Sequence, residues 1–140
     1  MIRRAIFLGS FPRLPHDADA VRRINAAGWQ AVVITNEREI DDGLRSALLE
    51  QGARLDGVYH CPHDAGTGCR CRKPAIALLE RARDEMGIDL AASRLVGATP
   101  LDLDTARAAG MPGLLVGAGH VETLDRAVAQ ALECVKGAPN

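Results

Sequence analysis

Short apolar runs alternate along this chain with longer segments in which apolar residues recur every three or four positions. Short runs of aliphatic and β-branched residues that end at turn-forming residues are typical of buried strands. Five such strands are predicted, at 5–8, 31–35, 57–60, 95–97 and 113–117.

The segments between these runs have helical periodicity. Residues 18–27 and 75–86 each place apolar side chains on one stripe, and a polar segment around Leu44 and Leu48 does the same. Thr99 followed by Pro100 is a good helix start, because threonine caps a first turn and proline is tolerated at its first position. A final helix is predicted from an apolar stripe made of Val121, Leu124, Val128, Leu132 and Val135.

This alternation of strands and helices predicts an α/β fold. Such chains build a parallel sheet covered by helices on both faces, so we expect one three-layer, Rossmann-like domain of about five strands over residues 1–140. Ligands of such folds bind outside the carboxyl ends of the strands. The segments expected there are 9–11, 35–36, 60–74 and 97–102.

Composition narrows the class of protein. The chain has 140 residues, 47% of them apolar and 25% charged, with a formal net charge of −1. This balance argues against nucleic acid or an anionic membrane as a partner, and no apolar run approaches the roughly 18 residues of a spanning helix. We therefore expect a cytoplasmic protein. The few aromatic residues, which predict an aliphatic core, are Phe7, Phe11, Trp29 and Tyr59.

Most of the cysteines lie close together, beside a histidine. Cys61, His63, Cys69 and Cys71 form a C-x-H-x5-C-x-C pattern, and three thiolates with one imidazole are a known tetrahedral zinc set. A reducing compartment also favours metal binding over a disulfide. Four protein ligands leave no open position, so the expected role is a structural Zn2+ that holds the 60–74 loop. The alternative is four unrelated loop residues.

Other cysteines and histidines, interpreted as ordinary core or surface residues, are Cys134, His16, His60 and His120.

The loop and its flanks resemble a known family. Residues 57–63 and the sequence C-R-C-R-K-P at 69–74 are similar to the zinc-loop phosphatases of the haloacid dehalogenase superfamily. Within it, the similarity is to the D-glycero-D-manno-heptose-1,7-bisphosphate 7-phosphatases and the histidinol-phosphate phosphatases. Further segments that resemble the family's motifs, so that the resemblance covers most of the chain, are 5–8, 28–36, 87–93 and 97–110.

This resemblance implies phosphomonoester hydrolysis through an aspartyl-phosphate. The family's first strand is followed by D-x-D, in which the first aspartate attacks phosphorus and the second protonates the leaving group and later activates water. A Mg2+ ion, bound in part by an acid of the fourth motif, neutralises the phosphate and the nucleophile. A threonine or serine of the second motif and the lysine of the third bind the phosphoryl oxygens.

The catalytic acids of that pattern are replaced in this chain. Gly9 and Phe11 stand at the D-x-D positions and Ala98 at the leading acid of the fourth motif, while Asp102, its second acid, remains. Gly9 has no side chain to attack with, and Phe11 cannot exchange a proton. We therefore predict a pseudo-phosphatase without catalytic residues and, because two of the family's Mg2+ ligands are lost, without Mg2+.

The phosphate-binding positions of the family are retained. Thr35, Asn36 and Lys73 stand where the family binds phosphate, with Arg72 beside them, and the two cations supply charge-assisted donors. With three carboxylates removed, we expect the site to be more electropositive than in an active relative and to bind a phosphorylated sugar or another anion without metal. The alternative is that Thr35 and Asn36 only end a strand, and that Arg70, Arg72 and Lys73 form a solvated basic patch.

Two other functions stay open. An active sugar-phosphate or histidinol-phosphate phosphatase would need a relocated nucleophile. Ser10 is the nearest hydroxyl, and the nearest base or acid along the chain is His16, Asp17 or Asp19. A purely structural module would instead bind a protein partner or a second copy of the chain.

Overall fold

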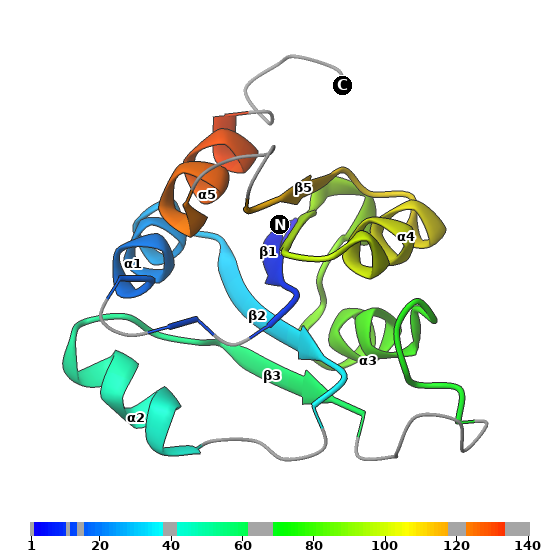
Figure 1. Cartoon of the computed structure of the whole chain (residues 1–140), viewed down its shortest axis with the longest axis horizontal. Coiled ribbons are helices and arrows are strands. Elements are labelled where there is room, and N and C mark those ends of the chain that lie inside the picture. The colour runs from blue at the N-terminus through cyan, green and yellow to red at the C-terminus, as the bar shows by residue number, and fades with distance from the viewer. Residues whose placement is uncertain are drawn as a thin grey trace.

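The predicted strands pair in parallel into one sheet. The computed structural model describes residues 2–10, 12–13, 16–37, 42–61, 69–117 and 123–133. The strands lie in the order β3-β2-β1-β4-β5 (Figure 1). Their bounds are β1 (Ala5–Leu8), β2 (Gln30–Thr35), β3 (Gly57–His60), β4 (Arg94–Gly97) and β5 (Gly113–Leu115). The last strand is shorter than predicted, because Gly117 takes a positive φ of 130° and turns the chain.

The predicted helices also form. They are α1 (Ala18–Ala26), α2 (Asp42–Glu50), α3 (Ala77–Met86), α4 (Pro100–Ala109) and α5 (Leu124–Glu133), with a 3-10 turn, η1, at Leu90–Ala92. Thr99 is the N-cap of α4 and Pro100 its first residue, as predicted. Val121 and Val135, the ends of the last predicted stripe, lie outside the described residues. No helix in the described ranges combines the length and apolar character that crossing a membrane requires.

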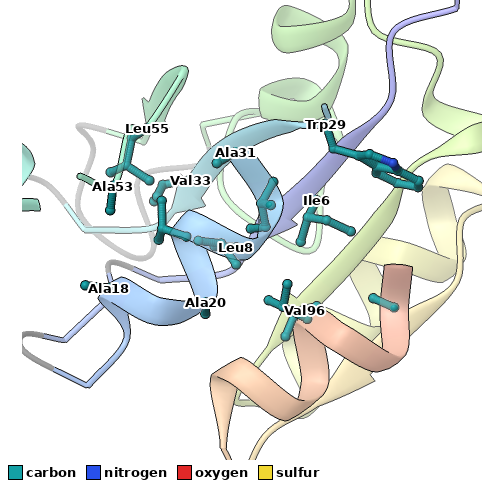
Figure 2. Packing of buried hydrophobic residues seen from close by; sticks show 14 of the residues in the cluster. Ile6, Leu8, Ala18, Ala20, Trp29, Ala31, Val33, Ala53, Leu55 and Val96 are labelled. Carbon is teal, nitrogen blue, oxygen red and sulfur yellow. The ribbon is translucent and has the colours of Figure 1, made fainter. Parts of the chain in front are cut away.

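Alternate residues of the central strands face opposite helix layers. In β1, Ile6 and Leu8 join an apolar cluster with α1, α2 and α5 (Figure 2), whereas Phe7 packs with α3 and α4. Trp29 is only 6% exposed, and the Arg4 guanidinium lies over its ring, 4.9 Å from the centroid. Both faces of the sheet are therefore covered, which confirms the three-layer α/β fold.

The strand order places a topological switch point between β1 and β4. From β1 the chain adds β2 and β3 on one side of the sheet, and it then returns to add β4 and β5 on the other. Leu8 pairs with Val96, and the Gly9 N–H donates to the Val96 carbonyl at 2.9 Å. Connections that leave neighbouring strands in opposite directions open a crevice at their carboxyl ends, so this edge is where a site is expected.

Candidate functional site

A buried ammonium group lies at the carboxyl ends of β1 and β2. It belongs to Lys73, in the segment before α3, whose side chain is 5% exposed. Its Nζ donates to the carbonyl oxygens of Gly9 at 2.7 Å and Ile34 at 3.2 Å, and to Oδ1 of Asp102 at 2.6 Å. Because an ammonium has three protons, these acceptors use the whole donor capacity of Lys73.

The partner carboxylate comes from the first turn of α4. Asp102 is the third residue of that helix, and its Oδ2 accepts from the backbone N–H of Ala98 at 3.1 Å and of Thr99 at 3.4 Å. An acid three residues after the N-cap is favoured because it satisfies an N–H that the helix leaves unpaired and meets the positive end of the helix. Asp102 thus caps α4 with one oxygen and pairs with Lys73 through the other.

Two glycines make room for this carboxylate. A Cβ atom added to Gly9 would lie 2.6 Å from the carboxyl carbon and both oxygens of Asp102, and one added to Gly97 would overlap the same side chain. The Asp102 carboxylate therefore fills the space in which a side chain at position 9 would lie. Loss of either partner of such a buried pair is strongly destabilising, because it leaves an uncompensated charge in the interior.

The residues predicted to bind phosphate come together, but they are bonded to one another. The Asn36 side chain makes two hydrogen bonds with the Lys73 backbone, at 2.8 and 3.3 Å, and the Arg72 guanidinium donates to the Asn36 carbonyl at 3.4 Å. Thr35 is buried at the end of β2, and its Oγ1 accepts from the Glu37 N–H at 3.1 Å. These contacts hold the loop before α3 against β2.

The Lys73 ammonium is compensated by a carboxylate of the same chain. Lys73 is neither an unpaired cation nor part of a solvated patch, because Asp102 neutralises it within the fold. Arg70 is exposed and Arg72 is half-buried. A phosphate at Lys73 would have to displace Asp102 or a carbonyl oxygen.

The described residues that directly follow β1 and β4 supply no carboxylate to a Mg2+ ion. Mg2+ prefers octahedral coordination by oxygen ligands, with one or two carboxylates among them. In the part of the chain that the structure describes, Gly9, Ser10 and Ala98 follow β1 and β4 and carry no carboxylate. Asp102 has both oxygens engaged by donors of the protein. Phe11 lies outside the described residues.

Three thiols meet where β3 ends and the segment before α3 begins. The Sγ atoms of Cys61, Cys69 and Cys71 all lie within 4.8 Å of one another, a donor set that could hold a metal ion. Cys61 Sγ is 2.8 Å from that of Cys71 and 3.4 Å from that of Cys69. The hydrogen bond with Cys61, together with burial and Cys69, raises the pKa of Cys71 to about 12. A bound cation would reverse this effect, since a coordinating thiol is deprotonated. His63, the predicted fourth ligand, lies outside the described residues.

A cavity of about 360 Å³ opens beside the same strand ends. Its lining includes Ser10, His16 and Asp17. These are residues that a phosphatase with a relocated nucleophile could use. Within the described ranges no hydrogen bond joins Ser10 to His16, and Asp17 Oδ2 instead accepts from the Arg13 N–H at 2.6 Å. Within these ranges no base is hydrogen-bonded to Ser10. Sequence reasoning missed Arg13 as a cavity residue; its one signal was its place just after the predicted ligand segment 9–11.

Comparison with known proteins agrees with the fold described above. A family model described as HAD-hydrolase-like matches residues 70–135. The chain is 33% identical to the D-glycero-beta-D-manno-heptose-1,7-bisphosphate 7-phosphatase of Pseudomonas aeruginosa over 127 residues, which are 81% of this chain and 71% of that protein. It is 32% identical to the protein of the same name from Rhodopseudomonas palustris over 130 residues, 76% of this chain and 72% of that protein.

A solved structure shares the fold. It is the crystal structure of the D,D-heptose 1.7-bisphosphate phosphatase from B. bronchiseptica complexed with magnesium and phosphate, which matches with a TM-score of 0.76 at 23% identity. The match covers 94% of this chain and 99% of that chain. From its fold and from identities above 30% over more than two thirds of its relatives' length, this chain belongs to the haloacid-dehalogenase-like family of the D-glycero-D-manno-heptose-1,7-bisphosphate 7-phosphatases.

Proposed function

We propose that this chain is a pseudo-phosphatase, a binding protein on a phosphatase fold that takes up a phosphorylated small molecule without hydrolysing it. One observation carries the proposal. Attack on phosphorus needs a nucleophile after β1, and the residue there is Gly9, beside which Asp102 fills the space of a side chain. Asp102 is in turn engaged by Lys73, the residue that the family resemblance assigns to phosphate.

The relatives supply a contrast that supports this proposal. The B. bronchiseptica phosphatase was crystallised with magnesium and phosphate. Metal-assisted transfer through an aspartyl-phosphate needs carboxylate oxygens on the metal and on the phosphorus, and neither Gly9 nor Ala98 has one. We therefore propose that this chain works without Mg2+.

The ligand's phosphate would bind between the end of β2 and the loop before α3. The half-buried Arg72 is the first donor available to it, and Thr35 and Asn36 add polar groups. Lys73 joins them only if the anion replaces Asp102 as its acceptor. A sugar phosphate is the class of ligand that the relatives' names favour.

The thiol cluster supports a structural zinc site in the same proposal. Cys61, Cys69 and Cys71 would hold the ion, and the sequence spacing adds His63 as the fourth ligand. Zinc with four protein ligands has no open position for a substrate, and it stabilises the fold around it. Here it would cross-link the end of β3 to the segment that carries Arg72 and Lys73, and so position both cations.

A phosphatase assay tests the loss of turnover. The zinc-loaded protein is incubated with Mg2+ and heptose 1,7-bisphosphate, histidinol phosphate or p-nitrophenyl phosphate, with the Pseudomonas aeruginosa relative as the positive control. We expect no phosphate release above the rate without protein. In the triple variant Gly9→Asp, Phe11→Asp, Ala98→Asp, the Asp102 side chain must rotate out of the space it fills, which frees Lys73, and we expect turnover to appear.

Mg2+-dependent phosphate release by the unaltered chain would overturn the proposal. It would favour the second candidate function, an active phosphatase with a non-standard site, which the shared cavity lining of Ser10, His16 and Asp17 supports. Loss of that release in Ser10→Ala would then assign the reaction to the cavity.

A further inference from the structure

A second candidate site lies on the opposite face of the sheet from Lys73. The Asp102 carboxylate packs against the side of Gly9 and Gly97 that faces α4. Leu8 and Val96, the residues just before these glycines, face α1 and α5 instead. The cavity of about 360 Å³ is lined by this pair and also by Gly9, Gly97 and Ala98, so it adjoins the Lys73–Asp102 pair from the side of α1 and α5.

The cavity occupies the place at which parallel sheets bind ligands. It opens at the carboxyl ends of β1 and β4, the neighbouring strands at the switch point of the sheet. Small-molecule sites have volumes of roughly 300–1,000 Å³, and this cavity falls near the lower end of that range. Its size fits a ligand no larger than a simple ring with one substituent.

The floor of the cavity is apolar. It is formed by Leu8 and Val96 from the two strands, Val116 just after β5, and Leu124 at the start of α5. All four pack in the same hydrophobic cluster. Contact between this surface and the hydrocarbon part of a ligand is favourable, because it removes apolar area from water.

The rim carries a guanidinium, an imidazole and a carboxylate. Arg13 and His16 are exposed there, and within the described residues neither side chain has a hydrogen-bond or ion-pair partner. Asp17 also lines the cavity, but its carboxylate accepts from the Arg13 N–H and stands at the N-cap of α1, where the positive end of the helix offsets its charge. Ser10 and Thr123 add hydroxyl groups to the rim.

Arg13 differs in this respect from the cations on the other face. Lys73 makes three hydrogen bonds to the protein, and Arg72 donates to the Asn36 carbonyl. An anion at Lys73 must displace a protein contact, whereas the Arg13 guanidinium makes none within the described residues. A free guanidinium presents a planar fork of donors that matches a carboxylate or a phosphate.

We propose that this cavity binds a small molecule with one anionic group on an apolar body. Arg13 and His16 hold the anionic group, a phosphate or a carboxylate, and the floor contacts the body. This goes beyond the proposed function, because Arg13 and His16 are not residues that the family resemblance assigns to phosphate.

Calorimetric titration of the intact zinc-loaded chain tests the site. Phenyl phosphate and benzoate carry the two anionic groups on one apolar body, and inorganic phosphate carries no body. We expect saturable 1:1 binding of at least one aromatic probe, weaker binding of inorganic phosphate, and a loss of about tenfold or more in Arg13→Gln. Arg107→Gln, an equal charge loss at an exposed position outside the lining, should change affinity less than about twofold. Trp29 fluorescence checks that each variant is folded.

The controls separate this site from the one on the other face. Absence of saturable binding, or equal losses in Arg13→Gln and Arg107→Gln, would overturn the inference. A loss confined to Arg72→Gln would also overturn it, because it would assign the anion to the loop before α3. Phosphate released from phenyl phosphate would contradict the proposed function, and the Arg13→Gln result would still decide the site.

Discussion

One carboxylate constrains several distant positions of the chain. Asp102 caps α4, neutralises Lys73, and leaves no space for a side chain at Gly9 or Gly97. A substitution at any of these positions therefore acts on the others. The glycine after β1 and the burial of the Lys73–Asp102 pair are two aspects of one arrangement.

Gly9→Ala tests this constraint. We expect it to lower the free energy of unfolding by about 1–3 kcal/mol, because the new Cβ must displace a carboxylate held by Lys73 and by the backbone. Gly113→Ala is the matched control, since its Cβ would lie 3.0 Å from Ala106 and from the movable end of Leu103. Urea unfolding gives both values. Equal losses would contradict a fixed position of Asp102.

The motif around Lys73 predicts a role for this residue but not its contacts. The family resemblance of the C-R-K-P segment predicts a phosphate-binding role for this residue. The acceptors of its ammonium are not visible there, because they lie 64, 39 and 29 positions away. Only the pairing of β1 with β2 and the docking of α4 bring these groups together.

Among the elements, the segment before α3 depends most on contacts outside itself. It contributes Cys69 and Cys71 to the thiol cluster and is bonded to Asn36 through the Lys73 backbone. The predicted helix over 75–86 begins only at Ala77, because the Ala75 N–H still donates to the Arg72 carbonyl in a turn. A metal cross-link at its start would therefore stabilise the whole segment.

Metal content tests that cross-link. We expect about one zinc per chain by atomic spectroscopy, a loss of it in Cys71→Ser, and retention in Cys134→Ser. If zinc contributes about 2.7 kcal/mol, chelation lowers Tm by roughly 10 °C. Full zinc content in Cys71→Ser, or an unchanged Tm after complete chelation, would contradict a structural metal at these thiols.

At the scale of the molecule, two hydrophobic layers share one sheet. Leu79 of α3 packs in the layer with Phe7, and Trp29 lies in the layer with Ile6 and Leu8. The residues of each central strand alternate between the two layers. Loss of packing in one layer is therefore transmitted to the other through the strands.

Truncation of one layer tests this coupling. Leu79→Ala should lower the free energy of unfolding by about 2–5 kcal/mol, with the same urea midpoint by far-UV circular dichroism and by Trp29 fluorescence, although Trp29 lies on the other face. Leu49→Ala is the control, because Leu49 is 62% exposed and its truncation should cost less than about 0.5 kcal/mol. Separate midpoints for the two probes would contradict one cooperative unit.

The order of strands and helices, the caps of α4 and the cysteine spacing follow from the amino-acid sequence alone, because each depends on neighbours within a few residues. The absence of a carboxylate at Gly9 and Ala98 is equally plain in it. Only the tertiary structure decided that Lys73 is neutralised by Asp102, and that Arg13 and His16 stand at the rim of a cavity with an apolar floor. Charge compensation depends on which groups meet across the fold, and that is settled only when the strands pair and the helices pack.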